Sequence, residues 1–97
     1  MPDNVKSIYS YAFYYCEDLN EITIGSGLTS LGSYYVFAGT SLKKITCYCE
    51  SEPSVSSETF ASISYGGTLY TPGVYYSTWM STEKYYLGYN SWGYEYI

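Results

Sequence analysis

One hydrophobic pattern occurs twice between Val5 and Cys47, and its repeat length constrains the fold more than any other feature of the chain. The apolar positions of the first copy are Val5, Ile8, Ala12, Phe13, Leu19, Ile22 and Ile24. A shift of 23 residues gives Leu28, Leu31, Tyr35, Val36, Leu42, Ile45 and Cys47. A fixed period of about 20 to 30 residues is typical of a solenoid, whose coils bury their apolar faces only against stacked neighbours.

The period predicts one β-rich domain over residues 1–97. We expect coils over about 5–27, 28–50 and 51–72, and a C-terminal cap over 73–97 with a short helix near Tyr75 to Met80. Ile22-Thr23-Ile24 alternates apolar and polar residues and predicts a strand. Ala12 and Phe13 are expected to enter the interior. The final segment, 93–97, is expected either to add a strand or to lie over the open end.

Tyr35 interrupts the pattern, because it occupies a position that holds Ala12 in the first coil. Burying a tyrosine where alanine fits costs about 1 to 3 kcal/mol, so we expect a local slip that turns Tyr35 outward. The third coil needs a shift of 24 residues. This shift pairs Leu31 with Val55, Val36 with Phe60, and Ile45 with Leu69.

Composition and charge exclude several classes of function. The net charge is −5 and there is no histidine, whereas a nucleic-acid surface needs clustered basic residues. The four basic residues are Lys6, Lys43, Lys44 and Lys84. Cys16, Cys47 and Cys49 are expected to be buried, unreactive thiols, and a Cys-x-Cys pair without histidine is too small a ligand set for zinc. We expect no metal and no cofactor.

The sequence offers no catalytic set. Acid-base chemistry would depend on carboxylates in turn-like segments, such as Glu17 and Asp18 or Glu50 and Glu52, which are better interpreted as solvated charges. No apolar run reaches the roughly 20 residues that span a bilayer. The N-terminus lacks a signal-peptide pattern, so a cytoplasmic location stays open beside an extracellular or surface one for a fragment of a secreted parent.

Two strings resemble the BspA-like, or Treponema-type, leucine-rich repeat. They are Ile8-Tyr9-Ser10-Tyr11-Ala12-Phe13-Tyr14-Tyr15-Cys16-Glu17-Asp18-Leu19 and Leu19-Asn20-Glu21-Ile22-Thr23-Ile24. The resemblance covers about residues 5–73 and implies a right-handed array of about three coils with parallel strands. It also implies a role in adhesion or protein recognition, usually within a larger bacterial surface protein.

Three positions depart from the family pattern. Tyr9 stands where the family has glycine, which Gly32 keeps in the second coil. Gly39 is expected in the column that Cys16 fills, and Tyr35 replaces a small residue. The second coil is therefore where the pattern and the structure are expected to differ most.

Binding is the predicted class of function, through the strand face and the tyrosine-rich tail. Outward strand residues and aromatic side chains form the candidate ligand surface. The candidates are Glu21, Thr23, Lys44, Thr46, Tyr48, Thr68, Tyr70, Tyr75, Tyr76, Trp79, Tyr85, Tyr86 and Trp92. The expected partner is a protein or a glycan, without nucleic acid or membrane insertion. The alternative is a structural unit that self-associates as a homo-oligomer through an uncapped N-terminal edge, where Val5, Ile8 and Ile22 would be open.

Overall fold

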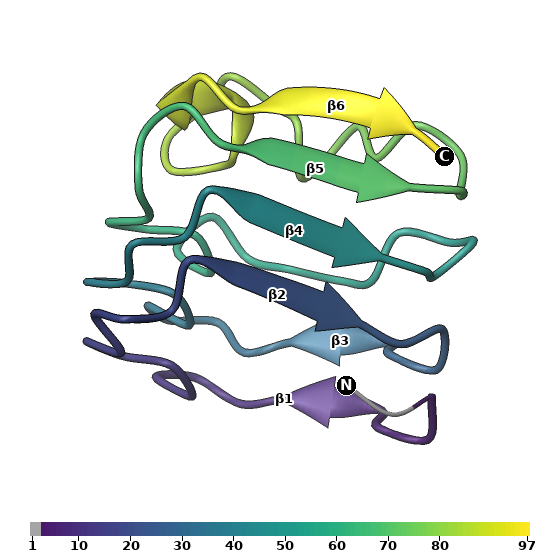
Figure 1. Ribbon diagram of the computed structural model, residues 1–97, viewed down its shortest axis with the longest axis horizontal. Helices are drawn as coiled ribbons and strands as arrows, with labels where there is room; N and C mark the ends of the chain where they lie inside the picture. The colour runs from purple at the N-terminus through teal and green to yellow at the C-terminus, as the bar shows by residue number, and fades with distance from the viewer. Residues whose placement is uncertain (1–2) are drawn as a thin grey trace.

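The chain is a parallel β-solenoid of about four turns, described by a computed structural model over residues 3–97 (Figure 1). Four strands form one sheet in the order β2-β4-β5-β6, and two short strands, β1 and β3, form the second. Every named pair is parallel. The elements are β1 (Ser7–Ile8), β2 (Glu21–Ile24), β3 (Ser30–Leu31), β4 (Lys44–Cys47), β5 (Thr68–Thr71), a 3-10 helix η1 (Gly88–Asn90) and β6 (Gly93–Tyr96).

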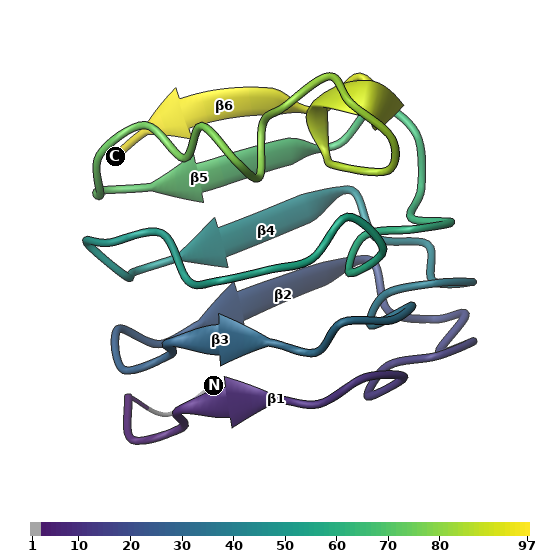
Figure 2. The same cartoon turned by 180° about the vertical axis from the view of Figure 1, so that it is seen from behind.

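Each of the first coils crosses the molecule twice. The chain runs along the small sheet in one direction, turns, and returns along the large sheet in the other, so that β1 and β3 point opposite to β2 and β4 (Figures 1 and 2). The turns at the two ends of the strands stack in register with those of the next coil. The fold therefore has two strand-bearing faces and two faces made of turns.

The sequence period sets the strand register. Ile22 pairs with Ile45 at the expected 23-residue shift, and Ile45 pairs with Leu69 at 24. Ile45 and Leu69 are fully buried, because alternate residues of a strand point to the same side of the sheet. The apolar columns thus fill the space between the two sheets, and the predicted solenoid is confirmed.

The aromatic column of the interior differs from the sequence alignment by one residue. The ring of Phe37 stacks on that of Phe13, with centroids 5.7 Å apart and planes 2° from parallel. Phe60 stacks on Phe37 in turn, at 6.0 Å. The backbone keeps the expected 24-residue register here, with Tyr34 bridged to Glu58 and Val36 N donating to Thr59 O. The ring that meets Phe60 is nevertheless that of Phe37 and not the side chain expected at Val36.

The cause is an extra residue in the second coil, as the slip at Tyr35 predicts. Leu31 lies one position further from Phe37 than Ile8 lies from Phe13. The extra residue lies between Leu31 and Tyr35, because Tyr35 repeats the left-handed backbone of Tyr11, with φ 50° and 63°. Tyr35 is half-buried rather than turned fully outward. The chain loses one residue before β4, which restores the 23-residue register.

The same slip moves Gly39 out of the cysteine column. The amide of Cys16 donates to Phe13 O, and the equivalent bond in the second coil runs from Thr40 to Phe37 O. Thr40 therefore holds the place expected of Gly39. Gly39 instead matches Tyr15, and both have left-handed backbones, with φ 74° and 56°.

The N-terminal coil has no described coil beneath it, which explains two further features. Ala12 is exposed rather than interior, and Phe13 is half-buried. In the second coil a Cβ added to Gly32 would lie 2.0 Å from Ser10 N, so only glycine allows the two coils to approach. Tyr9 holds that position in the first coil, where it is 78% exposed, because no described backbone lies beneath it.

The C-terminal segment forms a fourth coil, whereas the sequence predicts only about three coils and a cap. Strand β6 pairs with β5 along its length, from Thr68 with Gly93 to Thr71 with Tyr96. The helix expected near Tyr75 to Met80 is wrong: this stretch is a turn, closed by Met80 N donating to Tyr76 O at 2.9 Å. Aromatic and β-branched residues favour this outcome because they lose rotamer freedom in a helix.

Candidate functional site

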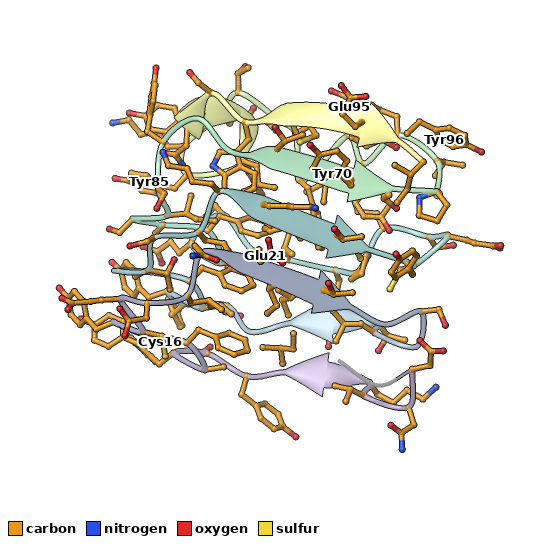
Figure 3. The ribbon with its side chains drawn as sticks, viewed as in Figure 1. Cys16, Glu21, Tyr70, Tyr85, Glu95 and Tyr96 are labelled. Carbon is orange, nitrogen blue, oxygen red and sulfur yellow. The ribbon has the colours of Figure 1, made fainter. Side chains whose placement is uncertain are left out.

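The outward side chains of the large sheet form two columns. One column runs Thr23, Thr46, Tyr70 and Glu95, and the other runs Glu21, Lys44, Thr68 and Gly93. Figure 3 shows Glu21, Tyr70 and Glu95 on the same sheet, each from a different strand. The predicted strand-face residues therefore lie side by side, and the fourth coil adds Glu95. Thr46 is only 8% exposed, however, so it offers little surface to a partner.

Lys44 and Tyr70 lie close together on this face. The ammonium of Lys44 lies 5.3 Å from the centroid of the Tyr70 ring, a distance at which the ring attracts the cation. Glu95 lies on the other side of Tyr70 in the register. The centre of the face thus offers an aromatic ring with a positive group on one side and a negative group on the other.

Three predicted ligand residues are core residues instead. Tyr76 and Trp79 are fully buried and Trp92 is 5% exposed, so none of them offers a surface to a partner. Trp79 Nε1 donates to Pro53 O and Trp92 Nε1 to Ser64 O, both in the third coil. Tyr76 donates to Cys49 O, just before that coil begins. They attach the fourth coil to the third.

The remaining tail residues do not form one patch. Tyr75 is 60% exposed and packs against Tyr94, with centroids 4.8 Å apart. Tyr85 lies at the opposite end of the strands from Tyr96 (Figure 3); it is 40% exposed, while Tyr86 is half-buried. The predicted continuous surface from the strand face into the tail is therefore divided between two sides of the molecule.

Sequence reasoning missed a cluster of tyrosines on the turns that join the small sheet to the large one. Tyr11, Tyr14, Tyr15 and Tyr35 line a pocket of about 280 Å³ together with Ala38, Gly39 and Ser62. Tyr11 meets Tyr14 edge to face at 5.3 Å. The ring of Tyr14 lies 4.4 Å from that of Tyr15 at 57°. The doubled Tyr-Tyr pairs, 14–15 and 34–35, were the available signal.

The backbone beneath this cluster is strained. Tyr11, Tyr15 and Tyr35 have φ of 63°, 56° and 50°, a left-handed conformation that costs about 1 to 2 kcal/mol for a residue with a Cβ. The second coil uses Gly39 at the place of Tyr15. Residues with strained backbones of this kind cluster at functional sites. Because backbone conformation disfavours tyrosine at these three positions, their side chains are candidates for a functional role.

The three thiols differ in environment. Cys47 and Cys49 are buried, as expected, but Cys16 is exposed, because the first coil is not covered from below. Burial raises the pKa of Cys47 to about 12 and also raises the pKa of its neighbour Tyr76. At neutral pH these interior groups are therefore protonated and uncharged.

No feature of the described residues points to metal or acid-base chemistry. Residues 3–97 contain no group of three or more potential metal ligands. A larger hollow of about 570 Å³ lies at the other turn face, where Lys6, Tyr48 and Glu50 are among its lining residues. Tyr70 is not among the residues that line this hollow. The charged side chains of its lining are Lys6 and Glu50, one of each sign.

The chain is a repeat protein of the leucine-rich solenoid class. Its parallel strands stack coil on coil, with equivalent residues 23 or 24 positions apart. A family model, BspA type leucine rich repeat region (6 copies), matches residues 1–75, and the chain belongs to this family. The family marks the chain as a repeat module of the kind used in protein interaction or adhesion. It is generally non-catalytic and typical of surface proteins.

The chain matches no curated protein and no solved structure. Among the described residues there is no helix with the length and apolar content to cross a bilayer.

Proposed function

We propose that the chain is a recognition module that binds a protein or glycan partner through the outward face of β2, β4, β5 and β6. The observation that supports this most directly is the in-register column of Thr23, Thr46, Tyr70 and Glu95. Such a face is regular and rigid, because every strand is held by its neighbour. A rigid face loses little conformational freedom on binding.

Tyr70 is the proposed centre of the contact. Tyrosine supplies a large, stiff, amphipathic area and is enriched among residues that dominate binding energy. Tyr70 is half-buried, and the ammonium of Lys44 lies over its ring, 5.3 Å from the centroid. Lys44 and Glu95 on either side supply charge-assisted hydrogen bonds of opposite sign.

Immobilised mucin glycoprotein, intact and enzymatically deglycosylated, tests the proposal by surface plasmon resonance. Binding to both forms indicates a protein surface as partner, and binding to the intact form alone indicates the glycan. Tyr70→Ala should weaken binding by about tenfold, the loss typical of a central contact. Tyr9→Ala is the matched control, because Tyr9 is exposed next to the small sheet. Equal binding by both variants and the parent would refute the strand face as the site.

Self-association is the second candidate. The N-terminal coil leaves Val5, Phe13, Leu19 and Ile22 only partly buried, and β2 pairs with a single described strand. Ile8, by contrast, is 7% exposed and is not part of an open apolar edge. An unpaired strand edge over an apolar surface can template pairing with another chain.

Light scattering during size exclusion tests this second candidate. Tyr9 would obstruct a coil stacked beneath it, since its equivalent, Gly32, tolerates no Cβ against the neighbouring backbone. Tyr9→Gly should therefore shift the distribution toward dimers or larger species if this edge self-associates. A monomer at high concentration for both the parent and Tyr9→Gly would remove the hypothesis.

A further inference from the structure

The tyrosine pocket on the turn face presents four aromatic rings around one hollow and no charged side chain. Tyr11, Tyr14, Tyr15 and Tyr35 supply the rings, and Ser62 supplies the other side-chain hydroxyl of the lining. The pocket is formed by turns of three successive coils. It therefore exists only because the coils stack, and it lies apart from the outward face of the large sheet.

The rings pack against one another at angles, with centroids 4.4 to 5.8 Å apart, and form no flat platform. Tyr11 and Tyr14 stand at 85° to one another, Tyr14 and Tyr15 at 57°, and Tyr11 and Tyr35 at 38°. Rings that meet at steep angles offer no flat surface to a sugar ring. With Ala38, Gly39 and Ser62 they leave instead a compact hollow of about 280 Å³.

The charge around the pocket favours a cation. The faces of aromatic rings carry negative potential and attract ammonium groups, most strongly where several rings surround them. The chain has a net charge of −5, and Glu17 and Asp18 follow Tyr15 closely in the same connection. No lysine lines the pocket.

The backbone conformation of these tyrosines also points to a role for their side chains. Three of the four tyrosines hold left-handed conformations, which glycine or asparagine would adopt at lower cost. The second coil shows this directly, because Gly39 takes the place of Tyr15 and the ring of Tyr15 lies against it, 2.0 Å from a Cβ added there. Tyrosine at these turns is therefore unfavourable for the fold and requires a reason in its side chain.

We propose that this pocket is an aromatic cage for a quaternary ammonium group. The cation enters the hollow lined by Tyr11, Tyr14, Tyr15 and Tyr35 and is held by attraction to the ring faces that border it. The methyl groups of such a cation fill the hollow and release water from the aromatic surfaces. The site is open, because Tyr11, Tyr14 and Tyr15 are 50%, 45% and 63% exposed as residues, so the affinity is modest.

Choline and its neutral isostere, 3,3-dimethyl-1-butanol, test the proposal in the parent protein. Both have the same shape, and only choline carries the charge. Titration followed by ¹H–¹⁵N NMR should shift the amides of Tyr15, Gly39 and Ser62 with a dissociation constant on the order of 1 to 10 mM for choline. The isostere should bind at least about tenfold more weakly. Equal binding of the two compounds, or no shift at about 50 mM choline, which is several times the upper end of that range, would refute the cage.

Paired variants assign the effect to the rings. Tyr14→Leu should weaken choline binding by about 2 to 5-fold, while Tyr14→Phe should leave it within about twofold, since phenylalanine keeps the ring. Tyr48→Leu, an exposed tyrosine outside the pocket, is the control for general loss of aromatic surface. Tyr14→Leu that binds as well as the parent contradicts the assignment.

Two further probes identify the source of the cation. Phosphatidylcholine vesicles that co-sediment with the protein, and co-sediment less with Tyr14→Leu, assign the site to a lipid headgroup. Binding of soluble glycerophosphocholine without vesicle binding assigns it to a free solute. Shifts that arise from glucose or mannose but not from choline would overturn the proposal. Tyr70→Ala should leave choline binding unchanged, which separates this site from the strand face.

Discussion

The rings of Phe13 and Phe37 stack within 2° of parallel although the two residues are 24 positions apart. Phe37 is fully buried and touches Phe60 above it, whereas Phe13 is only partly buried. Phe37 is therefore expected to contribute more than Phe13 to the free energy of unfolding.

Phe37→Ala should destabilise the protein by about 3 to 5 kcal/mol, because it removes a buried ring and leaves a cavity. Phe13→Ala is the matched control and should cost about half as much or less, since water already reaches that ring. Urea unfolding followed by circular dichroism measures both. Similar losses for the two variants would show that the first coil is covered in solution.

Gly32→Ala should cost about 1 to 3 kcal/mol, because its Cβ would overlap the backbone of the coil beneath and force the two apart. Gly93→Ala is the control, since a Cβ there would meet only Thr68 Oγ1, at 3.9 Å. The difference in urea midpoint between the two variants is the measurement. A tolerated Gly32→Ala would contradict the close approach of Gly32 and Ser10.

Tyr15→Asn should stabilise the fold by about 0.5 to 1 kcal/mol, because asparagine adopts the left-handed conformation more readily. It should also weaken choline binding, since one wall of the proposed cage is lost. Tyr14→Asn is the control: it loses a ring without relieving strain at a left-handed residue. Thermal unfolding and NMR titration together separate the two effects, and a destabilised Tyr15→Asn would argue against the strain.

One thiol should react rapidly in the native protein. Cys16 is exposed, while Cys47 and Cys49 are buried, so a maleimide should modify Cys16 first and all three only after unfolding. Mass spectrometry after brief labelling identifies the site. Cys16→Ser should abolish the rapid phase, and rapid loss of Cys47 in the native state would contradict the described packing.

Alkaline solution should destabilise the fold through the interior thiol. Burial raises the pKa of Cys47 from 9.0 to about 12, so the unfolded chain loses this proton first as pH rises. The contribution to stability is complete below pH 9 and decreases between about 9 and 12. Cys47→Ala should reduce the steepness of this decrease in urea unfolding measured across that range.

The fold was predictable where residues repeat and less so where the period changes. The 23-residue pattern predicted the pairing of Ile22 with Ile45, because buried strand positions alternate and recur. It could not predict that Phe37 stacks on Phe13. The second coil gains one residue before Phe37 and loses one before β4, so the strands keep the 23-residue register and the sequence period conceals the change. The fourth coil was hidden because its path from Thr71 to Gly93 uses turns and aromatic packing in place of the repeated motif.

The candidate sites were predictable in part. Alternation along strands is enough to place Thr23, Thr46 and Tyr70 in one column. Burial of Tyr76 and Trp79 could not be inferred, because tyrosine and tryptophan are found both in cores and at interfaces. The turn-face cage depends on left-handed backbones at Tyr11 and Tyr15, which no propensity for tyrosine indicates.

The attachment of the fourth coil has a spectroscopic consequence. Both tryptophans of the chain, Trp79 and Trp92, belong to this coil and donate to the backbone of the one before it. Indole fluorescence is therefore a local probe of the C-terminal end, whereas circular dichroism averages over the whole stack. A repeat array can lose its coils one after another. A fluorescence transition below the circular dichroism transition would show that this array unfolds from its C-terminal end, and one above it would show that it unfolds from its N-terminal end.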